Sequence, residues 1–309
     1  MSVLFLTRPQ PPEVFVARMA ALAPEIESFG AIEACNPAAV EAVVCYRLPR
    51  GIGEKLPNLR MVCASSAGVD KILGVEGLPP GLPVVRIVDE AQNRQIAQFV
   101  AMSALNHLRQ RALYARQQVE RSWTRHPIPA PDAATVGVLG LGAAGQVTAA
   151  TMLGLGLRVA GWSRSPRTLA GIETFHGPAG FAACLAKSDI LVCLLPLTDD
   201  TRSLLDRRAL AKLPKGAYVI NVARGAHLVE PDLLALIDEG HLAGAALDVQ
   251  GTEPLPADSP LWAHPAVVVT PHVASQPTVD SVTRQVIASV RRLRAGEPLE
   301  NVVDPARGY

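Results

Sequence analysis

Short apolar segments alternate with segments of helical spacing along the whole chain. The apolar segments lie near residues 3, 42, 60, 83, 135, 158, 189, 217, 243 and 266, and β-branched residues are common in them. Strands that alternate with helices form parallel sheets, and the uniform apolarity of several segments indicates strands that are covered on both faces. The pattern therefore predicts an α/β fold built from parallel sheets, without an internal repeat.

A long stretch without helix breakers separates the first strands from the later ones. From residue 93 to residue 121 apolar side chains recur at helical spacing, and the next breaker is Pro127. These apolar residues are Ile96, Val100, Leu105 and Leu108. The segment predicts one long helix with an apolar stripe between two α/β units.

The domain boundaries follow from the segments around this helix. The proline-rich stretch from 126 to 134 indicates an extended lead-in to a new unit. We place one domain at 99–276 and the other at 1–98 together with 277–309. A helix at about 278–295 should return to the first domain, because the tail after it is too short to fold alone.

Composition excludes several classes of protein. The chain has 29 basic and 28 acidic residues, a net charge of +1, and so offers no field that would hold nucleic acid. Its five cysteines are odd in number and far apart, which predicts buried reduced thiols rather than disulfides or a metal site.

The sequence also favours a cytoplasmic protein with no membrane partner. The first ten residues have no basic residue before their short apolar stretch and no cleavage site, so they predict a strand rather than a signal peptide. Residues 133–157 carry no charge and could span a bilayer by length. Several glycines and a strand-like beginning favour a globular interpretation of this segment.

A glycine-rich loop follows the predicted strand near residue 135. Gly140, Gly142 and Gly145 have the spacing G-x-G-x-x-G and precede a segment that can form a helix. In this context the first glycine permits a tight turn, the second lets a pyrophosphate approach the backbone, and the third lets the helix pack on the strand. The loop predicts a dinucleotide site in domain 99–276, and the alternative is a glycine-rich turn without a ligand.

The next strand ends where an NAD site carries a carboxylate for the ribose 2′-hydroxyl. Ser163, Arg164 and Ser165 stand there instead, and Arg167 follows. Guanidinium and hydroxyl groups bind a 2′-phosphate through charge-assisted hydrogen bonds, whereas a carboxylate repels it. We predict NADPH as the cofactor and NADH as a weaker alternative; the other interpretation is that Arg164 is an ordinary surface arginine.

Three polar residues, Arg224, Glu253 and His272, follow later predicted strands. We expect them to converge, because the carboxyl ends of parallel strands face the ligand crevice. An arginine pairs with a substrate carboxylate and polarises a ketone, a histidine suits a proton donor, and a carboxylate favours the protonated ring. Each residue alone also has a structural interpretation, as the end of a strand, a turn residue or an isolated histidine.

Six motifs occur together in one order. They are SSAGVD (65–70), GLGAAG (140–145), LPLTDDT (195–201), NVARG (221–225), LDV followed by EPL, and TPH. By these motifs nearly the whole chain resembles the D-isomer-specific 2-hydroxyacid dehydrogenases, and the separation of Arg224 and Glu253 is the usual one in that family. Within the family, GWSRS at the cofactor strand and the terminal DPARGY are similar to the glyoxylate/hydroxypyruvate reductases.

The resemblance implies two doubly wound parallel-sheet domains, a flavodoxin-like substrate domain and a Rossmann cofactor domain, with the cleft between them. It implies reduction of a small 2-keto acid such as glyoxylate or hydroxypyruvate, and a homodimer. Arg224 would bind the substrate carboxylate and keto oxygen, His272 would donate the proton, and Glu253 would support His272.

The resemblance also assigns binding residues. The backbone amides of Ala67 and Gly68 would hold the substrate carboxylate, and Asp248 would engage the nicotinamide carboxamide. Tyr46 and Arg47 lie where related reductases shape the substrate pocket. The full set predicted to bind the cofactor is Gly140, Gly142, Ala143, Ala144, Gly145, Ser163, Arg164, Ser165, Arg167, Leu195, Pro196, Thr198, Val222 and Asp248.

Two departures from the family pattern affect these expectations. Gln98 stands where the family commonly has glutamate, and Ser163 stands where NAD-dependent members have aspartate. Two other functions stay open at this point. One is a phosphoglycerate dehydrogenase, although the chain ends soon after the predicted return helix, and the other is a nucleotide-sensing protein of the corepressor type.

Overall fold

The chain divides into two compact units in the computed structural model, which describes residues 2–305. The first unit comprises residues 1–90 and 276–309, and the second comprises residues 91–275. The break predicted at 98/99 falls inside helix α3 (Glu90–Leu108), which apart from its first residue groups with the second unit. The last four residues of the DPARGY ending lie outside the described residues.

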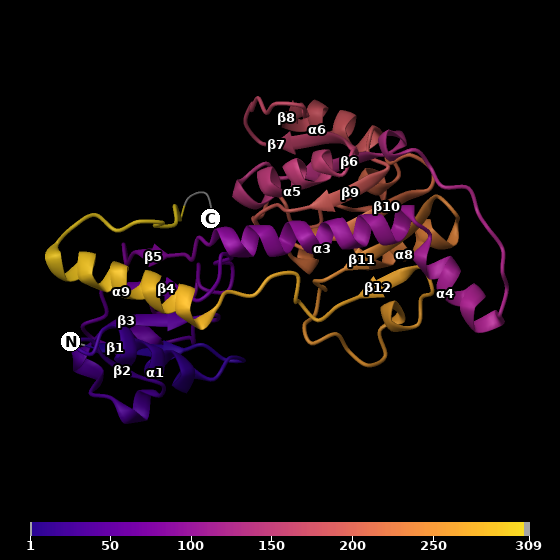
Figure 1. The fold of residues 1–309 in the computed structure, drawn as a ribbon. Helices are drawn as coiled ribbons and strands as arrows, with labels where there is room; N and C mark the ends of the chain where they lie inside the picture. The colour runs from indigo at the N-terminus through magenta and orange to yellow at the C-terminus, as the bar shows by residue number, and fades with distance from the viewer. Residues whose placement is uncertain (1, 306–309) are drawn as a thin grey trace. The chain divides into compact units, whose positions relative to one another are not determined.

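The first unit is built on a five-stranded parallel sheet with the order β2-β1-β3-β4-β5 (Figure 1). This is the strand order of flavodoxin-like doubly wound sheets. The strands are β1 (Ser2–Leu6), β2 (Glu27–Phe29), β3 (Val40–Cys45), β4 (Met61–Ala64) and β5 (Val84–Val85).

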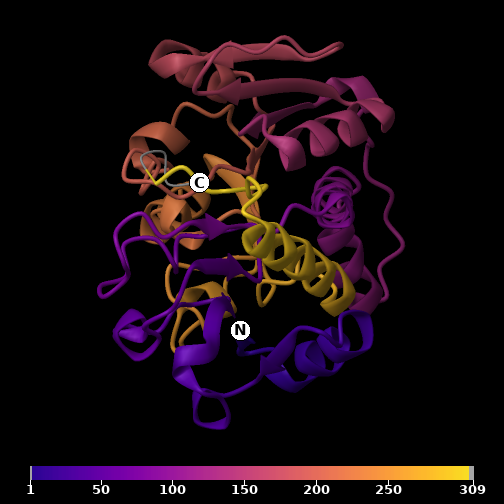
Figure 2. The same cartoon turned by 90° about the vertical axis from the view of Figure 1, so that its left-hand side faces the viewer.

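Helices cover one face of this sheet, and a short helix with its loops covers the other. On one face α1 (Pro12–Leu22) and α9 (Val279–Ala295) pack together, with Phe15 and Val286 in the core between them and the sheet (Figures 1 and 2). On the other face lies α2 (Ile52–Lys55), and the short 3₁₀ turns are η1 (Ile32–Ala34) and η2 (Pro37–Ala39). The predicted return helix at 278–295 is confirmed by α9.

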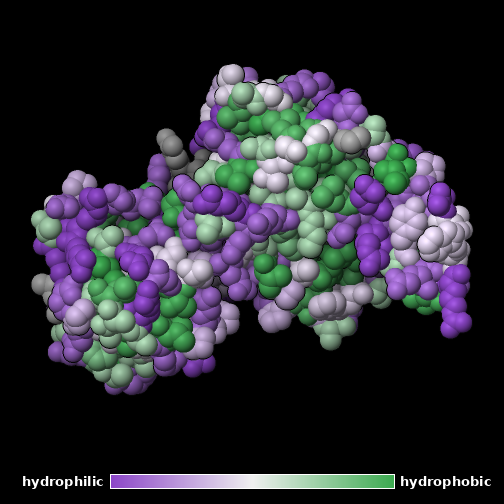
Figure 3. All heavy atoms as spheres, viewed as in Figure 1, coloured by the Kyte–Doolittle hydropathy of each residue, from purple (hydrophilic) through white to green (hydrophobic). Residues whose placement is uncertain are grey.

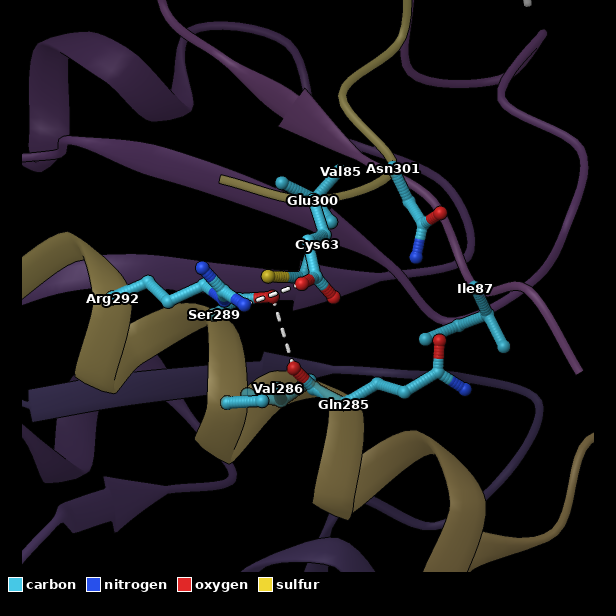
Figure 4. A pocket seen from close by; sticks show the side chains of 10 residues that line it. Cys63, Val85, Ile87, Gln285, Val286, Ser289, Arg292, Glu300 and Asn301 are labelled. Carbon is cyan, nitrogen blue, oxygen red and sulfur yellow. Dashed lines mark hydrogen bonds and ion pairs between the residues drawn. The ribbon is translucent and has the colours of Figure 1, made fainter. Parts of the chain in front are cut away.

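A small cavity lies beside α9 in the first unit (Figure 4). Cys63 and Val85 of the sheet, Gln285 of α9 and Asn301 of the C-terminal segment line it. Its volume is about 40 Å³, which is enough for a few ordered water molecules. A dinucleotide requires a pocket roughly ten times larger, so the cofactor site is elsewhere.

The second unit is built on a seven-stranded parallel sheet with the order β12-β11-β10-β9-β6-β7-β8. Counted from β6, this is the doubly wound dinucleotide-binding order with one strand added at the edge. The strands are β6 (Thr135–Leu139), β7 (Arg158–Ser163), β8 (Glu173–His176), β9 (Ile190–Cys193), β10 (Ala217–Asn221), β11 (Leu242–Leu247) and β12 (Val267–Val269).

Helices cover both faces of the second sheet. Helices α3 and α5 (Ala143–Gly154) pack on one face through residues such as Val100 and Met152. Helices α6 (Gly177–Ala186), α7 (Arg207–Leu210) and α8 (Glu230–Asp238) pack on the other face. The 3₁₀ turns are η3 (Pro131–Ala133), η4 (Gly225–His227) and η5 (Pro260–Trp262). Two parallel doubly wound sheets confirm the predicted fold class.

The single long helix predicted for 93–121 is wrong. The structure has two helices instead, α3 and α4 (Arg111–Glu120), and Gln110 between them is left-handed with φ 53°. The Gln110 side chain donates a hydrogen bond to the carbonyl of Pro127 at 2.8 Å. This contact with the following segment holds the bend between α3 and α4. The residues around the bend include no proline or glycine, so the local sequence does not predict it.

The uncharged stretch 133–157 is globular, as the glycines indicate. It divides into β6, the glycine loop and α5, and no helix among residues 2–305 is long and apolar enough to cross a membrane.

The cysteines are free thiols, as the sequence predicts. Burial raises the pKa of Cys45, Cys63, Cys184 and Cys193 to about 12, so these thiols stay protonated at neutral pH. Cys35 is only partly buried.

Candidate active site

The glycine loop lies at the point where the order of the second sheet reverses. Gly140 follows β6, whose two neighbours in the sheet are β7 and β9. Its φ is +99°, and a Cβ there would lie 2.7 Å from the carbonyl oxygen of Leu194 after β9. Only glycine fits this turn. In doubly wound sheets the ligand crevice opens at this reversal, outside the carboxyl ends of the strands.

The N-terminus of α5 fits a pyrophosphate group. The helix opens with Ala143, Ala144 and Gly145, and among the described residues no side chain caps its first amides. The side of Gly142 where a Cβ would project is open to 4 Å, whereas a Cβ on Gly145 would lie 1.8 Å from the Gly140 carbonyl oxygen. The first turn of a helix presents N–H groups and a partial positive charge to an anion. Open space at Gly142 and close packing at Gly145 match the roles expected of a dinucleotide loop.

The end of β7 lies beside this loop, since the amide of Gly140 donates to the carbonyl of Trp162 at 2.8 Å, and two exposed arginines follow the strand. Ser163 is buried, and its hydroxyl donates to the carbonyl of Ser165 at 2.8 Å. Arg164, Ser165 and Arg167 are exposed. The Ser163 hydrogen bond curls the chain directly after the strand, and the segment 161–168 contains no carboxylate.

The loop after β9 is held by a threonine within it. The Thr201 hydroxyl donates to the Pro196 carbonyl at 2.8 Å and accepts from the Thr198 amide at 2.8 Å. Leu195 is buried, and Pro196 and Thr198 are half-buried. These hydrogen bonds hold the loop in one conformation next to the glycine turn.

Arg224 stands just beyond β10, in extended conformation before the turn η4. Val222 before it is buried, and the Arg224 side chain is half-buried. One guanidinium nitrogen donates to the Ala223 carbonyl at 2.7 Å, and Asn221 donates to the Arg224 carbonyl at 3.0 Å. These bonds hold the arginine at the carboxyl end of the sheet.

Glu253 and His272 are in direct contact. Nδ1 of His272 lies 3.1 Å from each carboxylate oxygen of Glu253, although 19 residues separate the two in sequence. The side chain of His272 is 30% exposed and that of Glu253 is 26% exposed, so the pair is open to solvent and to a ligand on one side. A carboxylate at Nδ1 fixes the ring orientation and leaves Nε2 for a second partner.

Asp248 holds the turn that carries His272. Its wholly buried carboxylate accepts hydrogen bonds from the Thr270 hydroxyl at 2.6 Å and from the amides of Val273 and Ala274 at 2.9 and 2.8 Å. Its carbonyl accepts from the amide of His272 at 2.8 Å. These bonds stabilise His272 at φ 57°, a left-handed conformation that is uncommon for histidine.

The remaining predicted residues belong to the first unit. Ala67 is exposed beside Gly68, whose carbonyl accepts from the Ser66 hydroxyl at 2.9 Å. Tyr46 is half-buried, Arg47 is exposed, and Lys71 donates to the Tyr46 hydroxyl at 2.9 Å. Gln98, by contrast, belongs to the second unit, where it is exposed on α3.

Comparison with known proteins identifies the family. A family model described as D-isomer specific 2-hydroxyacid dehydrogenase, NAD binding domain, matches residues 101–274. A glyoxylate/hydroxypyruvate reductase A from Yersinia enterocolitica is 37% identical over 257 residues, which are 82% of this chain and 82% of that protein. The chain belongs to the D-isomer-specific 2-hydroxyacid dehydrogenases. Its enzyme class is therefore that of the NAD(P)-dependent 2-hydroxyacid dehydrogenases, as the motifs predict.

Solved structures of this dehydrogenase family have the same fold. A D-isomer specific 2-hydroxyacid dehydrogenase from Xanthobacter autotrophicus Py2 in complex with NADPH and MES matches with a TM-score of 0.94 and 37% identity, over 100% of this chain and 99% of that one. An NADPH-dependent glyoxylate/hydroxypyruvate reductase from Sinorhizobium meliloti in complex with NADP and sulfate matches with a TM-score of 0.93 and 35% identity, over 100% of both chains.

The sequence patterns do not single out three further residues of this dehydrogenase. His227 touches the Arg224 and Pro196 carbonyls, Thr201 holds the Pro196 loop, and Lys71 contacts Tyr46. Thr201 lies inside the LPLTDDT motif, and its place in that motif could have indicated a role in the loop. His227 and Lys71 contact residues that are distant in the sequence, and no motif predicts these contacts.

Proposed function

We propose that this 2-hydroxyacid dehydrogenase reduces glyoxylate or hydroxypyruvate with NADPH, and that His272 donates the proton. The observation that carries the proposal is the contact of His272 Nδ1 with both carboxylate oxygens of Glu253. This contact fixes the ring in an orientation from which an Nε2–H can reach a substrate oxygen. The names of the relatives from Yersinia enterocolitica and Sinorhizobium meliloti support the choice of substrate.

The residues of this chain then have separate tasks. Arg224 pairs with the substrate carboxylate and polarises the keto oxygen, so that the developing alkoxide is stabilised. His272 gives its proton to that oxygen, and Glu253 holds the ring. The amides of Ala67 and Gly68 bind the carboxylate. The bound nicotinamide supplies the hydride, and the protein supplies orientation and charge.

The cofactor residues of the second unit support NADPH. The amides that open α5 suit the pyrophosphate, and Val222 and the loop from Leu195 to Thr198 line the cofactor site. The contact expected between Asp248 and the nicotinamide carboxamide is not part of this proposal, because the Asp248 carboxylate is wholly buried and accepts three hydrogen bonds from the 270–274 turn. Arg164 and Arg167, with the hydroxyl of Ser165, bind the 2′-phosphate, and the buried hydroxyl of Ser163 holds the turn that carries them.

The ratio of kcat/KM with NADPH to that with NADH tests the cofactor proposal. A charge-assisted contact contributes roughly 1.5 to 3 kcal/mol, so NADPH should be preferred by about one to two orders of magnitude. The double variant Ser163→Asp with Arg164→Ala should lose this preference, because the new carboxylate repels the phosphate and binds the 2′-hydroxyl. Arg158→Ala, an exposed arginine at the opposite end of β7, is the control and should leave the ratio unchanged. A wild-type ratio that favours NADH would contradict the proposal.

The pH profile of the reduction tests the Glu253–His272 pair. Activity should fall as pH rises, because the ring must carry a proton to donate. Glu253→Gln removes the carboxylate that holds the ring at Nδ1, so the pH profile of kcat/KM should differ from that of wild type. The control is Asp238→Asn, which removes the carboxylate beside His264 in the same unit, and its profile should match wild type. Identical pH profiles for Glu253→Gln and wild type would show that Glu253 does not act on His272 in the reaction.

We also propose a homodimer that forms through α3 and α4. Most of the predicted apolar stripe packs inside its own unit, since Val100 is buried and Ile96 and Leu108 are partly buried. The opposite side of α3 exposes Met102 and Leu105, and Trp123 after α4 is 93% exposed. Apolar areas are visible on this side of the second unit in Figure 3. Exposed apolar side chains of this size are typical of protein interfaces.

Light scattering at micromolar concentration should give the mass of a dimer. Leu105→Glu should lower the measured mass towards that of a monomer, because it places a charge in the interface. Leu155→Glu, at a similarly exposed leucine after α5, is the control. A monomer mass for the wild-type protein would exclude this assembly at that concentration.

A further inference from the structure

His227 is a buried titratable side chain that the proposed mechanism does not use. It closes the turn η4 directly after Arg224, and none of its surface is exposed. Burial of a polar ring is costly unless it is hydrogen-bonded, so its partners indicate its role.

The imidazole ring bridges two loops of the second unit. Nδ1 lies 3.0 Å from the carbonyl oxygen of Arg224, and Nε2 lies 3.2 Å from the carbonyl oxygen of Pro196. A neutral imidazole donates to one of these oxygens, and an imidazolium donates to both. The ring thus ties the chain at Arg224, after β10, to the loop after β9.

Other bonds hold the backbone of this turn whatever side chain stands at 227. The amide of His227 donates to the Arg224 carbonyl at 3.2 Å, and the amide of Leu205 donates to the His227 carbonyl at 2.9 Å. Asn221 also donates to the Arg224 carbonyl. The ring adds a side-chain link from the carbonyl of Arg224 to the carbonyl of Pro196, beside the backbone bonds that join this turn to residues 203 and 205.

We infer that His227 is a positioning residue, which sets the Arg224 main chain against the Pro196 loop so that the guanidinium meets the substrate. The inference rests on the substrate-binding role proposed for Arg224. Displacement of a binding group by about 1 Å costs on the order of 100-fold in rate. His227 should therefore affect catalysis without touching substrate or cofactor.

Three variants separate the two contacts. His227→Leu removes both, His227→Asn keeps a donor near the position of Nδ1, and His227→Gln keeps one near the position of Nε2. We expect kcat/KM for glyoxylate to fall about 10- to 100-fold in the leucine variant and less in the other two. The dissociation constant of NADPH should stay within threefold in all of them. His107→Leu, at a partly buried histidine stacked on Tyr218, is the control and should leave kcat/KM unchanged.

A double-mutant cycle with Arg224→Ala decides between positioning and general structural support. If His227 acts through Arg224, His227→Leu should lower kcat/KM by less than twofold in the Arg224→Ala background. The same loss in both backgrounds, or wild-type kcat/KM for His227→Leu, would overturn the inference. If the leucine variant fails to bind NADPH, the asparagine and glutamine variants replace it in the cycle with the same criteria. Wild-type activity of Arg224→Ala alone would instead overturn the proposed function.

Discussion

Arg224→Ala should lower kcat/KM for the 2-keto acid by roughly 30- to 3000-fold while NADPH still binds. Loss of a paired charged contact costs about 2 to 5 kcal/mol, and each 1.4 kcal/mol is a factor of ten. The loss should appear in kcat as well as in KM, because the guanidinium stabilises the alkoxide that develops in the transition state. Steady-state kinetics with saturating NADPH, together with fluorescence titration of NADPH, measures both effects.

Two variants make the Arg224 experiment specific. Arg224→Lys keeps the positive charge but loses the planar fork, so it should recover only part of the activity. Arg208→Ala removes an exposed arginine on α7 in the same unit and should behave as wild type. If the turnover of Arg224→Ala stayed within twofold of wild type, Arg224 would not be a residue of the active site.

His272→Asn should lower kcat by about 100- to 10,000-fold, the usual contribution of a positioned general acid. Asparagine is the suitable replacement because His272 has φ 57°, and asparagine accepts the left-handed region with little strain. The backbone of the turn should survive, since the bonds to Asp248 come from main-chain amides and Thr270. Single-turnover kinetics at several pH values measures the effect on the chemical step.

His264→Asn is the matched control for this variant. His264 also faces a carboxylate, with Nε2 at 3.2 Å from Asp238, in the same unit. Its replacement should leave kcat unchanged, because the pair lies outside the proposed site. If His272→Asn kept the wild-type rate and its pH profile, the proton would have to come from another donor.

The sequence by itself determined the sheets, the glycine loop and the kinds of group at the site. Continuous apolar segments of strand length identify the strands that are covered on both faces, such as β6 and β10, because burial of both faces requires apolar residues throughout. The glycines at 140 and 145 were interpretable because backbone oxygens leave no room for a Cβ there. The strands β2 and β8 were missed, since they are short strands at sheet edges that are not wholly apolar.

Only the tertiary structure decided how distant segments meet. The bend between α3 and α4 depends on the bond from Gln110 to Pro127, and helical periodicity on both sides conceals it. The contact of Glu253 with His272, the hold of Asp248 on the 270–274 turn, and the His227 bridge to Pro196 join chain segments that follow different strands. Their sequence separations carry no local signal, because such contacts form when parallel strands bring their carboxyl ends to one edge of the sheet.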